Sequence, residues 1–346
     1  MTGALAMAEP AGWFELPEGK VARAPAELRG LPRDGVRLLL TAGTIEHHRF
    51  SDLERILDPG DLLVVNDSTT LAAAVDIADG RVVHFSTAID GGFHIVEIRR
   101  RMGRGSERLR EVSAGLLTLP GGGRLNLLAP YPAGSGNERL WLTEATFPFA
   151  FHEYLRRHGR PITYDRSTAP QTIEAYQTVF ARTAGSAEMP SAARPFTPEL
   201  VTQLVRRGVR IAPITLHSGV SSLEAGERPY AEWYEVPAET ASLVNHTRRS
   251  GHRVVAVGTT VVRALETVAS GETAHPGRGW TDLYVTGGHD ISLIDGLITG
   301  WHEATSTHLE MLISIAGARA IEESYEIALT EGYLWHEFGD SHLILT

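Results

Sequence analysis

The stretch that decides the fold is RVVAVGTTVVRALE, residues 253–266. Residues 254–257 form a short, uncharged and mostly β-branched run, which is typical of a strand buried on both faces of a sheet. Gly258 ends this run, and Thr259 and Thr260 stand where a helix would begin, with hydroxyl groups suited to cap its first turn. The stretch therefore predicts a strand, a tight turn and a helix, the repeating unit of α/β proteins.

The start of this predicted helix is also a candidate binding site. The first N–H groups of a helix favour an anionic ligand group, and α/β proteins place their sites at the carboxyl ends of strands. Arg263 and Glu266 are three residues apart, so they share one face of the helix. The alternative is an ordinary strand–helix unit with a good cap and a surface ion pair, because the stretch matches no nucleotide-binding fingerprint.

Composition is that of a soluble globular protein and favours neither a membrane nor a nucleic-acid partner. Its 346 residues suffice for two domains and a large core, with 42% hydrophobic and 21% charged residues. No apolar run is long enough to span a membrane, and no basic flank precedes an apolar core at the N-terminus, so we expect neither a membrane span nor a signal peptide. The absence of cysteine excludes disulfides and thiolate metal sites and favours the cytoplasm. A net charge of −10 gives no global attraction to RNA, although a local patch can still bind it.

The pattern of hydrophobic and polar residues is different between residues 71 and 143 from that in the rest of the chain. Short alternating segments are separated by glycine-rich turns there, and no helical pattern is present. We expect a small antiparallel β-barrel or sandwich, residues 71–143, inserted into a major domain made of residues 1–70 and 144–346. The basic stretch around Arg99, Arg100, Arg101, Arg104 and Arg108 is suited to phosphates or, alternatively, forms a solvated loop.

Outside this segment, strands and helices alternate, and polar residues follow the strands. Asn66 and Asp67 open a polar run directly after a predicted strand at 61–65; this run is a candidate site or an Asx turn. His217 and His302 also stand at predicted strand ends. We expect further strands at 209–216, 232–236 and 282–286, and helices at 238–251 and 305–318.

Several stretches together resemble the S-adenosylmethionine:tRNA ribosyltransferase-isomerase family of queuosine biosynthesis. Each match alone is weak, but their shared order along almost the whole chain is specific. The matching stretches are PGDLLVVND at 59–67, YQTVFA at 176–181, Gly185-Ser186, TLHSG at 215–219, EWYEV at 232–236, AVGTTVVRALE at 256–266, LITGWH at 297–302 and Gly339-Asp340. The resemblance implies a barrel-like major α/β domain with an inserted small antiparallel β-barrel. It also implies a reaction in which S-adenosylmethionine gives its ribosyl portion to a 7-aminomethyl-7-deazaguanine base in tRNA and releases adenine and methionine.

The chain departs from the family at polar positions. The family typically reads NDTR with an arginine a few residues later, whereas this chain has Thr69 and Ala74 there. The family's PTAGLHFT becomes PSAARPFT at 190–197, so that Pro195 replaces a histidine, and TNFHLP becomes TGWHEA at 299–304. Threonine and alanine cannot replace bidentate arginine donors, and proline cannot transfer a proton. This pattern points to retained S-adenosylmethionine binding with a changed acceptor or even a changed reaction.

The chemistry of such a reaction suggests roles for the candidate residues. A sulfonium next to the ribose C5′ makes that carbon acidic, so the enzyme needs a base near it and donors around the leaving groups. The resemblance and the residue types together give His217 and His302 as candidate bases. For S-adenosylmethionine they give Glu232 or Glu266 for the ammonium or a ribose hydroxyl, Thr259, Thr260 and Arg263 for the methionine carboxylate, Tyr176 or Trp233 for stacking on adenine, and Thr178 as a further contact. Residues expected to face the acceptor are Asn66, Asp67 and Ser191.

Three hypotheses about function follow. The first is the family activity, with S-adenosylmethionine as co-substrate and tRNA as acceptor. The second is a paralogue that uses S-adenosylmethionine on a small deazapurine-like acceptor, or alone, as a lyase or isomerase. The third is a non-catalytic S-adenosylmethionine-binding protein. In each case we expect no metal, since the histidines lack a metal-binding spacing, and no membrane partner; we expect a monomer or a weak homo-oligomer.

Overall fold

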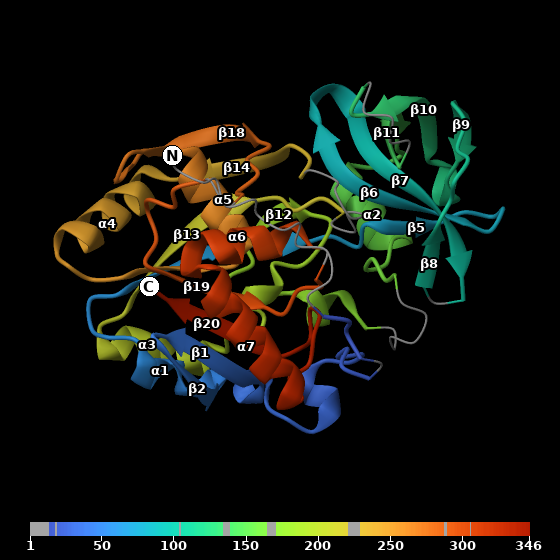
Figure 1. The fold of residues 1–346 in the computed structure, drawn as a ribbon. Coiled ribbons are helices and arrows are strands. Elements are labelled where there is room, and N and C mark those ends of the chain that lie inside the picture. The colour runs from blue at the N-terminus through green and yellow to red at the C-terminus, as the bar shows by residue number, and fades with distance from the viewer. Residues whose placement is uncertain are drawn as a thin grey trace, which may run out of the picture.

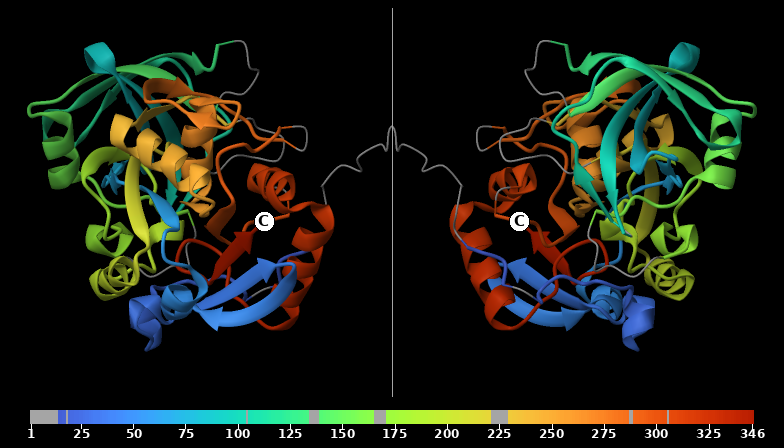
Figure 2. Two further views of the ribbon diagram at one scale, coloured as in Figure 1. Left: turned by 90° about the vertical axis from the view of Figure 1, so that its left-hand side faces the viewer. Right: turned by 90° about the vertical axis from the view of Figure 1, so that its right-hand side faces the viewer.

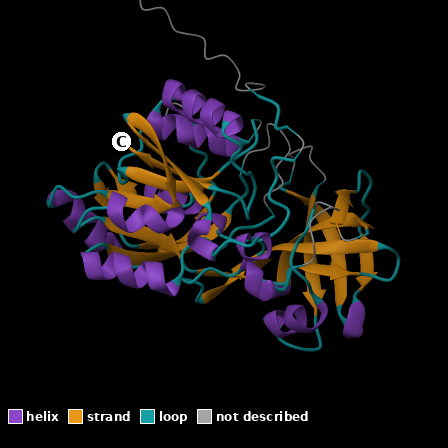
Figure 3. Ribbon diagram, turned by 90° about the horizontal axis from the view of Figure 1, so that it is seen from below, coloured by secondary structure: helices purple, strands orange, loops and turns teal. Residues whose placement is uncertain are grey.

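The structure is a computed structural model of the whole chain, and it describes residues 14–17, 19–103, 105–133, 139–164, 171–220, 229–286, 289–304 and 306–346. Two sheets dominate it (Figure 1). Figure 3 shows the strands in two separate groups, with most of the helices packed around the larger group. Among the described residues, no helix is both long and apolar enough to cross a membrane.

The larger sheet is mixed and has nine strands. Its order is β18 (Gly277–Thr281), β14 (Glu232–Val236), β13 (Arg210–Leu216), β3 (Leu62–Asn66), β15 (Val254–Val257), β19 (Gly296–Gly300), β20 (Ser341–Leu345), β1 (Arg37–Ala42) and β2 (Thr44–Arg49). The four central strands β13, β3, β15 and β19 are parallel neighbours. Their carboxyl ends therefore meet at one edge of the sheet. The predicted α/β class is confirmed, and the barrel-like arrangement stays a prediction.

Helices cover both faces of this sheet, as Figures 1 and 2 show. On one face lie α4 (Ala238–Arg249), α5 (Thr259–Thr267), α6 (Thr307–Ala316) and α7 (Ala318–Thr330), and on the other α1 (Leu53–Ile56) and α3 (Pro198–Arg207). Successive residues of β15 alternate between the two cores: Val254 and Ala256 belong to the first, Val255 and Val257 to the second. Each pair is removed from water, which confirms the predicted strand buried on both faces.

The second sheet is antiparallel and lies apart from the first, in cyan and green in Figure 1. Its strands are β5 (Ala74–Asp76), β6 (Arg81–Ile89), β7 (Phe93–Met102), β8 (Gly105–Arg108), β9 (Gly115–Thr118), β10 (Arg124–Tyr131) and β11 (Leu140–Thr146). They enclose a separate hydrophobic core, which Tyr154 and Leu155 of α2 (Phe151–His158) complete. This sheet uses the stretch in which an inserted β-domain was expected; the division of the chain into domains at 71 and 143 stays a prediction.

Short elements connect these parts. Two small pairs are β4 (Ser68–Thr70) with β12 (Thr183–Ser186) and β16 (Ala269–Ser270) with β17 (Thr273–Ala274). The 3₁₀ turns are η1 (Ala26–Arg29), η2 (Arg33–Gly35), η3 (Phe50–Asp52), η4 (Asp90–Gly92), η5 (Pro120–Gly122), η6 (Ile173–Tyr176) and η7 (Ser191–Ala193).

Three local predictions were wrong. Residues 282–286 form no strand, because β14 pairs instead with the preceding residues Gly277–Thr281. Neither threonine hydroxyl caps the helix that begins at Thr259, because the N-cap residue is Gly258, which has no side chain. A φ of 99° at this position favours glycine. The basic stretch lies largely on β7 and β8 rather than in a loop.

Arginines of this basic stretch form ion pairs with carboxylates. Arg99 is buried and contacts Glu97 at 2.7 Å, while Arg100 lies 3.3 Å from Glu107. Such pairing lowers the charge that is available to phosphates. Arg104 lies outside the described residues, and the phosphate-binding role of the stretch stays a prediction.

Candidate functional site

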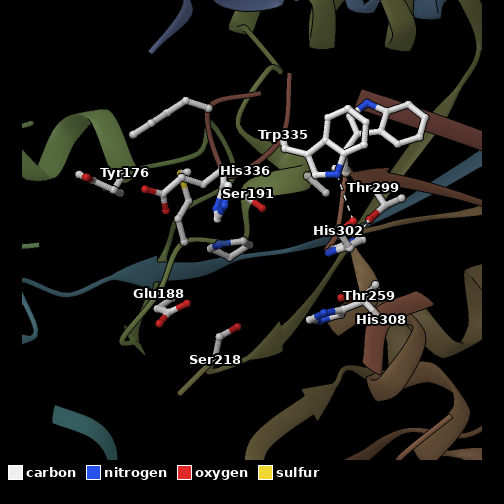
Figure 4. A pocket seen from close by; sticks show the side chains of 18 of the residues that line it. Tyr176, Glu188, Ser191, Ser218, Thr259, Thr299, His302, His308, Trp335 and His336 are labelled. Atoms are coloured by element: carbon white, nitrogen blue, oxygen red, sulfur yellow. Dashed lines mark hydrogen bonds between the residues drawn. The ribbon is translucent and has the colours of Figure 1, made fainter. Parts of the chain in front are cut away.

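A cavity of about 610 Å³ opens at the carboxyl edge of the larger sheet. It is bounded by the residues that follow β13, β15 and β19, by the loop around Glu188 and by the turn that precedes β20. Figure 4 shows side chains from these segments converging on one space. A site of this size and position is typical of small-molecule binding in α/β proteins.

The start of α5 forms one part of the wall. Thr259 and Thr260 line the cavity. Their predicted role in holding the methionine carboxylate stays a prediction. Thr260 Oγ1 accepts a hydrogen bond from the buried amide of Asn66 at 3.3 Å, and that amide also donates to the Leu216 carbonyl at 2.9 Å. Asn66 thus ties the ends of three parallel strands together beneath the site. The first N–H groups of α5 lack partners within the helix and are suited to hold a carboxylate.

Two histidines form the neighbouring wall. His302, a predicted site residue, shares a 2.9 Å hydrogen bond between Nε2 and Thr299 Oγ1 and stacks on His308 at 4.5 Å. His308 Nδ1 lies 2.9 Å from Ser306 Oγ. Burial lowers the pKa of His302 well below its usual range and that of His308 to about 4. Both rings are therefore neutral at pH 7, and both are weak proton acceptors.

The turn before β20 closes the cavity from another side. Trp335 donates from Nε1 to the His302 carbonyl at 3.1 Å, the dashed line of Figure 4. The next residue, His336, lines the cavity with its Nε2 3.5 Å from Glu303 Oε1. His336 has a φ of 74°, unusual for a residue other than glycine.

Glu188 and Tyr176 lie on the opposite side from Thr259 and His308 in Figure 4. Glu188 accepts a 2.6 Å hydrogen bond from the Tyr164 hydroxyl. The predicted residue Tyr176 lines the cavity, but its ring packs against Phe338 at 5.2 Å, and burial raises its pKa to about 12. The predicted Ser191 lines the same space.

The charged side chains that line the cavity are mainly of one sign. Among the described residues that line it are the acidic residues Glu188, Glu303 and Glu337, whereas this part of the chain contributes no arginine or lysine to the lining. Burial and the charge of Glu188 raise the pKa of Glu337 to about 7, so Glu337 is only partly ionised at neutral pH. The cavity therefore attracts cations and disfavours phosphates.

Other predicted residues lie behind the wall rather than in the described lining. His217 stacks on Trp233 at 5.3 Å and its Nδ1 lies 2.8 Å from Ser68 Oγ, while burial lowers its pKa to about 4. Glu232 accepts from the Gly219 backbone N–H at 2.8 Å. These contacts fix the loop whose Ser218 does line the cavity. Their effect on a ligand would be indirect.

Arg263 and Glu266 share a helix face but do not pair with each other. Arg263 forms an ion pair with Glu232 and donates from Nε to the Leu283 carbonyl at 2.9 Å. Glu266 accepts from the backbone N–H groups of Ser292 at 3.1 Å and Leu293 at 3.0 Å. Both side chains are buried and hold connecting segments in place, which argues against the surface ion pair considered above.

The remaining predicted residues have local partners. Thr178 Oγ1 accepts from the Phe180 backbone N–H at 3.3 Å. Asp67 accepts from Thr215 Oγ1 at 2.6 Å and lies 2.7 Å from an Arg182 nitrogen. Three departures from the family pattern also lie outside the described lining; these are Thr69, Ala74 and Pro195. The departures within the TGWHEA stretch do line the cavity; these are Gly300, Trp301 and Glu303.

Close packing beneath the site gives a first prediction. A Cβ built on Gly185 would lie 2.5 Å from the His217 ring, so we expect Gly185→Ala to lower the free energy of unfolding by about 1–3 kcal/mol. Denaturant unfolding measures this loss. Gly300→Ala is the control, because a Cβ there meets nothing within 4 Å. Equal stability of the two variants would contradict the packing argument.

Sequence reasoning missed Glu188, Glu303, His308 and His336 as site residues. Only Glu303 carried a signal, because it lies in the TGWHEA stretch that departs from its motif. The described residues contain no cluster of three or more His, Asp or Glu side chains placed to hold a metal.

Comparison with known proteins finds similar proteins over almost the whole chain. A family model described as queuosine biosynthesis protein matches residues 13–344. Proteins named S-adenosylmethionine:tRNA ribosyltransferase-isomerase from Moorella thermoacetica and Symbiobacterium thermophilum are 36% and 34% identical, with 96% of this chain and 98% of each relative covered. The crystal structure of an S-adenosylmethionine tRNA ribosyltransferase from Thermotoga maritima is similar with a TM-score of 0.54 and 29% identity, covering 96% of this chain and 99% of that one.

Proposed function

The chain belongs to the S-adenosylmethionine:tRNA ribosyltransferase-isomerase family of queuosine biosynthesis, and from this premise we propose that its cavity is the active site. The enzyme transfers the ribosyl portion of S-adenosylmethionine to a 7-aminomethyl-7-deazaguanine base in tRNA. Adenine and methionine are the leaving products.

The observation that carries this proposal is the one-sided charge of the cavity. S-adenosylmethionine carries a sulfonium and an ammonium group, and the acceptor base carries an aminomethyl group that is protonated at pH 7. The carboxylates of Glu188 and Glu303 favour these cations, and the partly ionised Glu337 adds to them. The tRNA phosphates would remain outside, since the described lining offers them no arginine or lysine.

The two sides of the cavity suit different parts of the reactants. The N-terminus of α5, at Thr259 and Thr260, would hold the methionine carboxylate. Glu188, on the opposite side, would receive the aminomethyl ammonium of the acceptor, with the Tyr164 hydroxyl fixing its carboxylate. Tyr176 remains our candidate for contact with adenine, and Ser191 for contact with the acceptor.

The other predicted residues would act through the cavity wall. We propose that Asn66, His217, Trp233 and Glu232 fix the strand ends and the loop that presents Ser218. Asp67, Thr178, Arg263 and Glu266 would support the same walls through their local bonds. The proposal also includes a barrel-like curvature of the larger sheet, no metal requirement and a cytoplasmic location.

Binding measurements test the charge argument. We expect S-adenosylmethionine to bind at least about tenfold more tightly than S-adenosylhomocysteine, because the homocysteine compound lacks the sulfonium charge that the carboxylates favour. Isothermal titration calorimetry at low and high salt measures both affinities. Equal affinities at low salt would contradict recognition of the cation by the cavity.

A further inference from the structure

One histidine of the cavity differs from the others in its partner. His336 faces a carboxylate, Glu303, with 3.5 Å between Nε2 and Oε1. The pair is open to a ligand, because the side chains are 49% and 60% exposed and both residues line the cavity. A carboxylate beside an imidazole stabilises the imidazolium that forms when the ring takes a proton.

The backbone holds this pair in place from both sides. Trp335 and His302 immediately precede the two partners, and the Trp335 indole N–H donates to the His302 carbonyl at 3.1 Å. The turn itself is clamped, since the Gly339 N–H donates to the His336 carbonyl at 2.8 Å and the Trp335 N–H donates to the Lys20 carbonyl at 2.7 Å. These bonds maintain His336 at a φ of 74°. Strained backbone that its surroundings enforce is concentrated at functional sites.

The other histidines near the cavity are less suited to accept a proton. His302 and His308 bond to hydroxyl groups and stack on each other. His217 lies behind the wall, bonded to Ser68 and stacked on Trp233. Burial lowers the pKa of each of these rings.

We propose that His336, oriented by Glu303, is the general base that removes the C5′ proton of S-adenosylmethionine. This inference rests on the proposed function and deepens it. In the step, the C5′–H bond breaks, its electron pair stays on the carbon next to the sulfonium, and the proton forms an N–H bond on the imidazole. The Glu303 carboxylate stabilises the resulting imidazolium. Glu303 is a departure from the TNFHLP motif, so the pair is a feature of this chain.

The variant His336→Gly tests this role with little risk to the fold, because glycine adopts a positive φ without strain. We expect kcat to fall at least about 100-fold, the usual contribution of a general base. The KM for S-adenosylmethionine should change less than threefold, and added imidazole should restore part of the rate. Glu303→Gln should lower kcat about tenfold, since it removes only the charge that stabilises the imidazolium.

His48→Gln is the matched control. His48 also pairs with a glutamate, at 3.2 Å from Glu46, but lies on β2 away from the cavity, so its loss should leave kcat unchanged. Exchange of the C5′ hydrogen in D₂O and release of adenine are followed together. A kcat for His336→Gly within threefold of the unmodified enzyme would overturn this assignment and leave the proposed function standing. Unmodified protein that neither exchanges C5′ hydrogen nor releases adenine would overturn both.

Discussion

Replacement of Glu232 by alanine is expected to lower the free energy of unfolding by about 3 kcal/mol, the lower end of the cost of breaking a buried ion pair. Arg263 would lose its carboxylate while its side chain, only 10% exposed, stayed in the interior. The Gly219 N–H would lose its acceptor as well. Three backbone carbonyls would still accept from Arg263, which is why we do not expect the full cost; these are the carbonyls of Leu283, Thr281 and Tyr230.

This loss should be accompanied by loss of catalysis, because Glu232 holds the loop that carries Ser218. Urea unfolding measures the stability, and adenine release measured well below the midpoint separates the two effects. Glu235→Ala, on the same strand, is the control and should change stability by less than about 1 kcal/mol. If Glu232→Ala were as stable as this control, the ion pair between Glu232 and Arg263 would not stabilise the fold, which would contradict this prediction.

The second large effect concerns Glu188. We expect Glu188→Lys to raise the KM for the acceptor tRNA at least about 100-fold, because an attraction of roughly 4 kcal/mol between charges about 4 Å apart becomes a repulsion. The KM rises because the aminomethyl ammonium would face the new lysine. The affinity for S-adenosylmethionine should change less than tenfold, since we place that substrate's carboxylate at α5, across the cavity.

Steady-state kinetics with varied tRNA, together with calorimetry of S-adenosylmethionine, measures both quantities. Glu323→Lys is the matched control, because it makes the same change of net charge at an exposed position of α7. Loss of S-adenosylmethionine affinity with an unchanged KM for tRNA would place Glu188 beside the wrong reactant and contradict our assignment.

The sequence predicted the elements whose patterns are local. The buried β-branched run of β15, the glycine that ends it and the helix from Thr259 all follow from neighbouring residues. Five of the predicted site residues line the cavity, and their roles stay predictions; these are Thr259, Thr260, His302, Tyr176 and Ser191. Each of these five stands at a strand end or in a stretch that was compared with a family motif.

Long-range partners were beyond the reach of local patterns. Glu188, Glu303 and His336 come from three separate loops, and only the packing of β19 against β20 brings the last two together. Arg263 and Glu266 were expected to face a ligand because they share one face of a helix that begins at a strand end, in a stretch that matches the family. In the structure both are buried and bind connecting segments that follow in the chain, which no helical spacing reveals.

The structure changes how the departures from the family pattern bear on the identity of the acceptor. Thr69, Ala74 and Pro195 suggested a changed acceptor, but none of them lies in the described lining. The departures that do line the cavity are in the TGWHEA stretch, and one of them, Glu303, adds a carboxylate. The carboxylates that do line the cavity suit a cationic acceptor such as the aminomethyl base. The activity on tRNA is therefore our preferred function over a small-molecule paralogue or a non-catalytic binding protein.

One measurement tests this function most directly. Purified protein is incubated with S-adenosylmethionine and with tRNA that carries 7-aminomethyl-7-deazaguanine, with the same tRNA lacking that base, or with no tRNA, and adenine and methionine are followed by chromatography. We predict equal amounts of adenine and methionine, released only with the modified tRNA. Release at the same rate without tRNA would contradict the tRNA activity and identify the protein as an enzyme that acts on a small molecule.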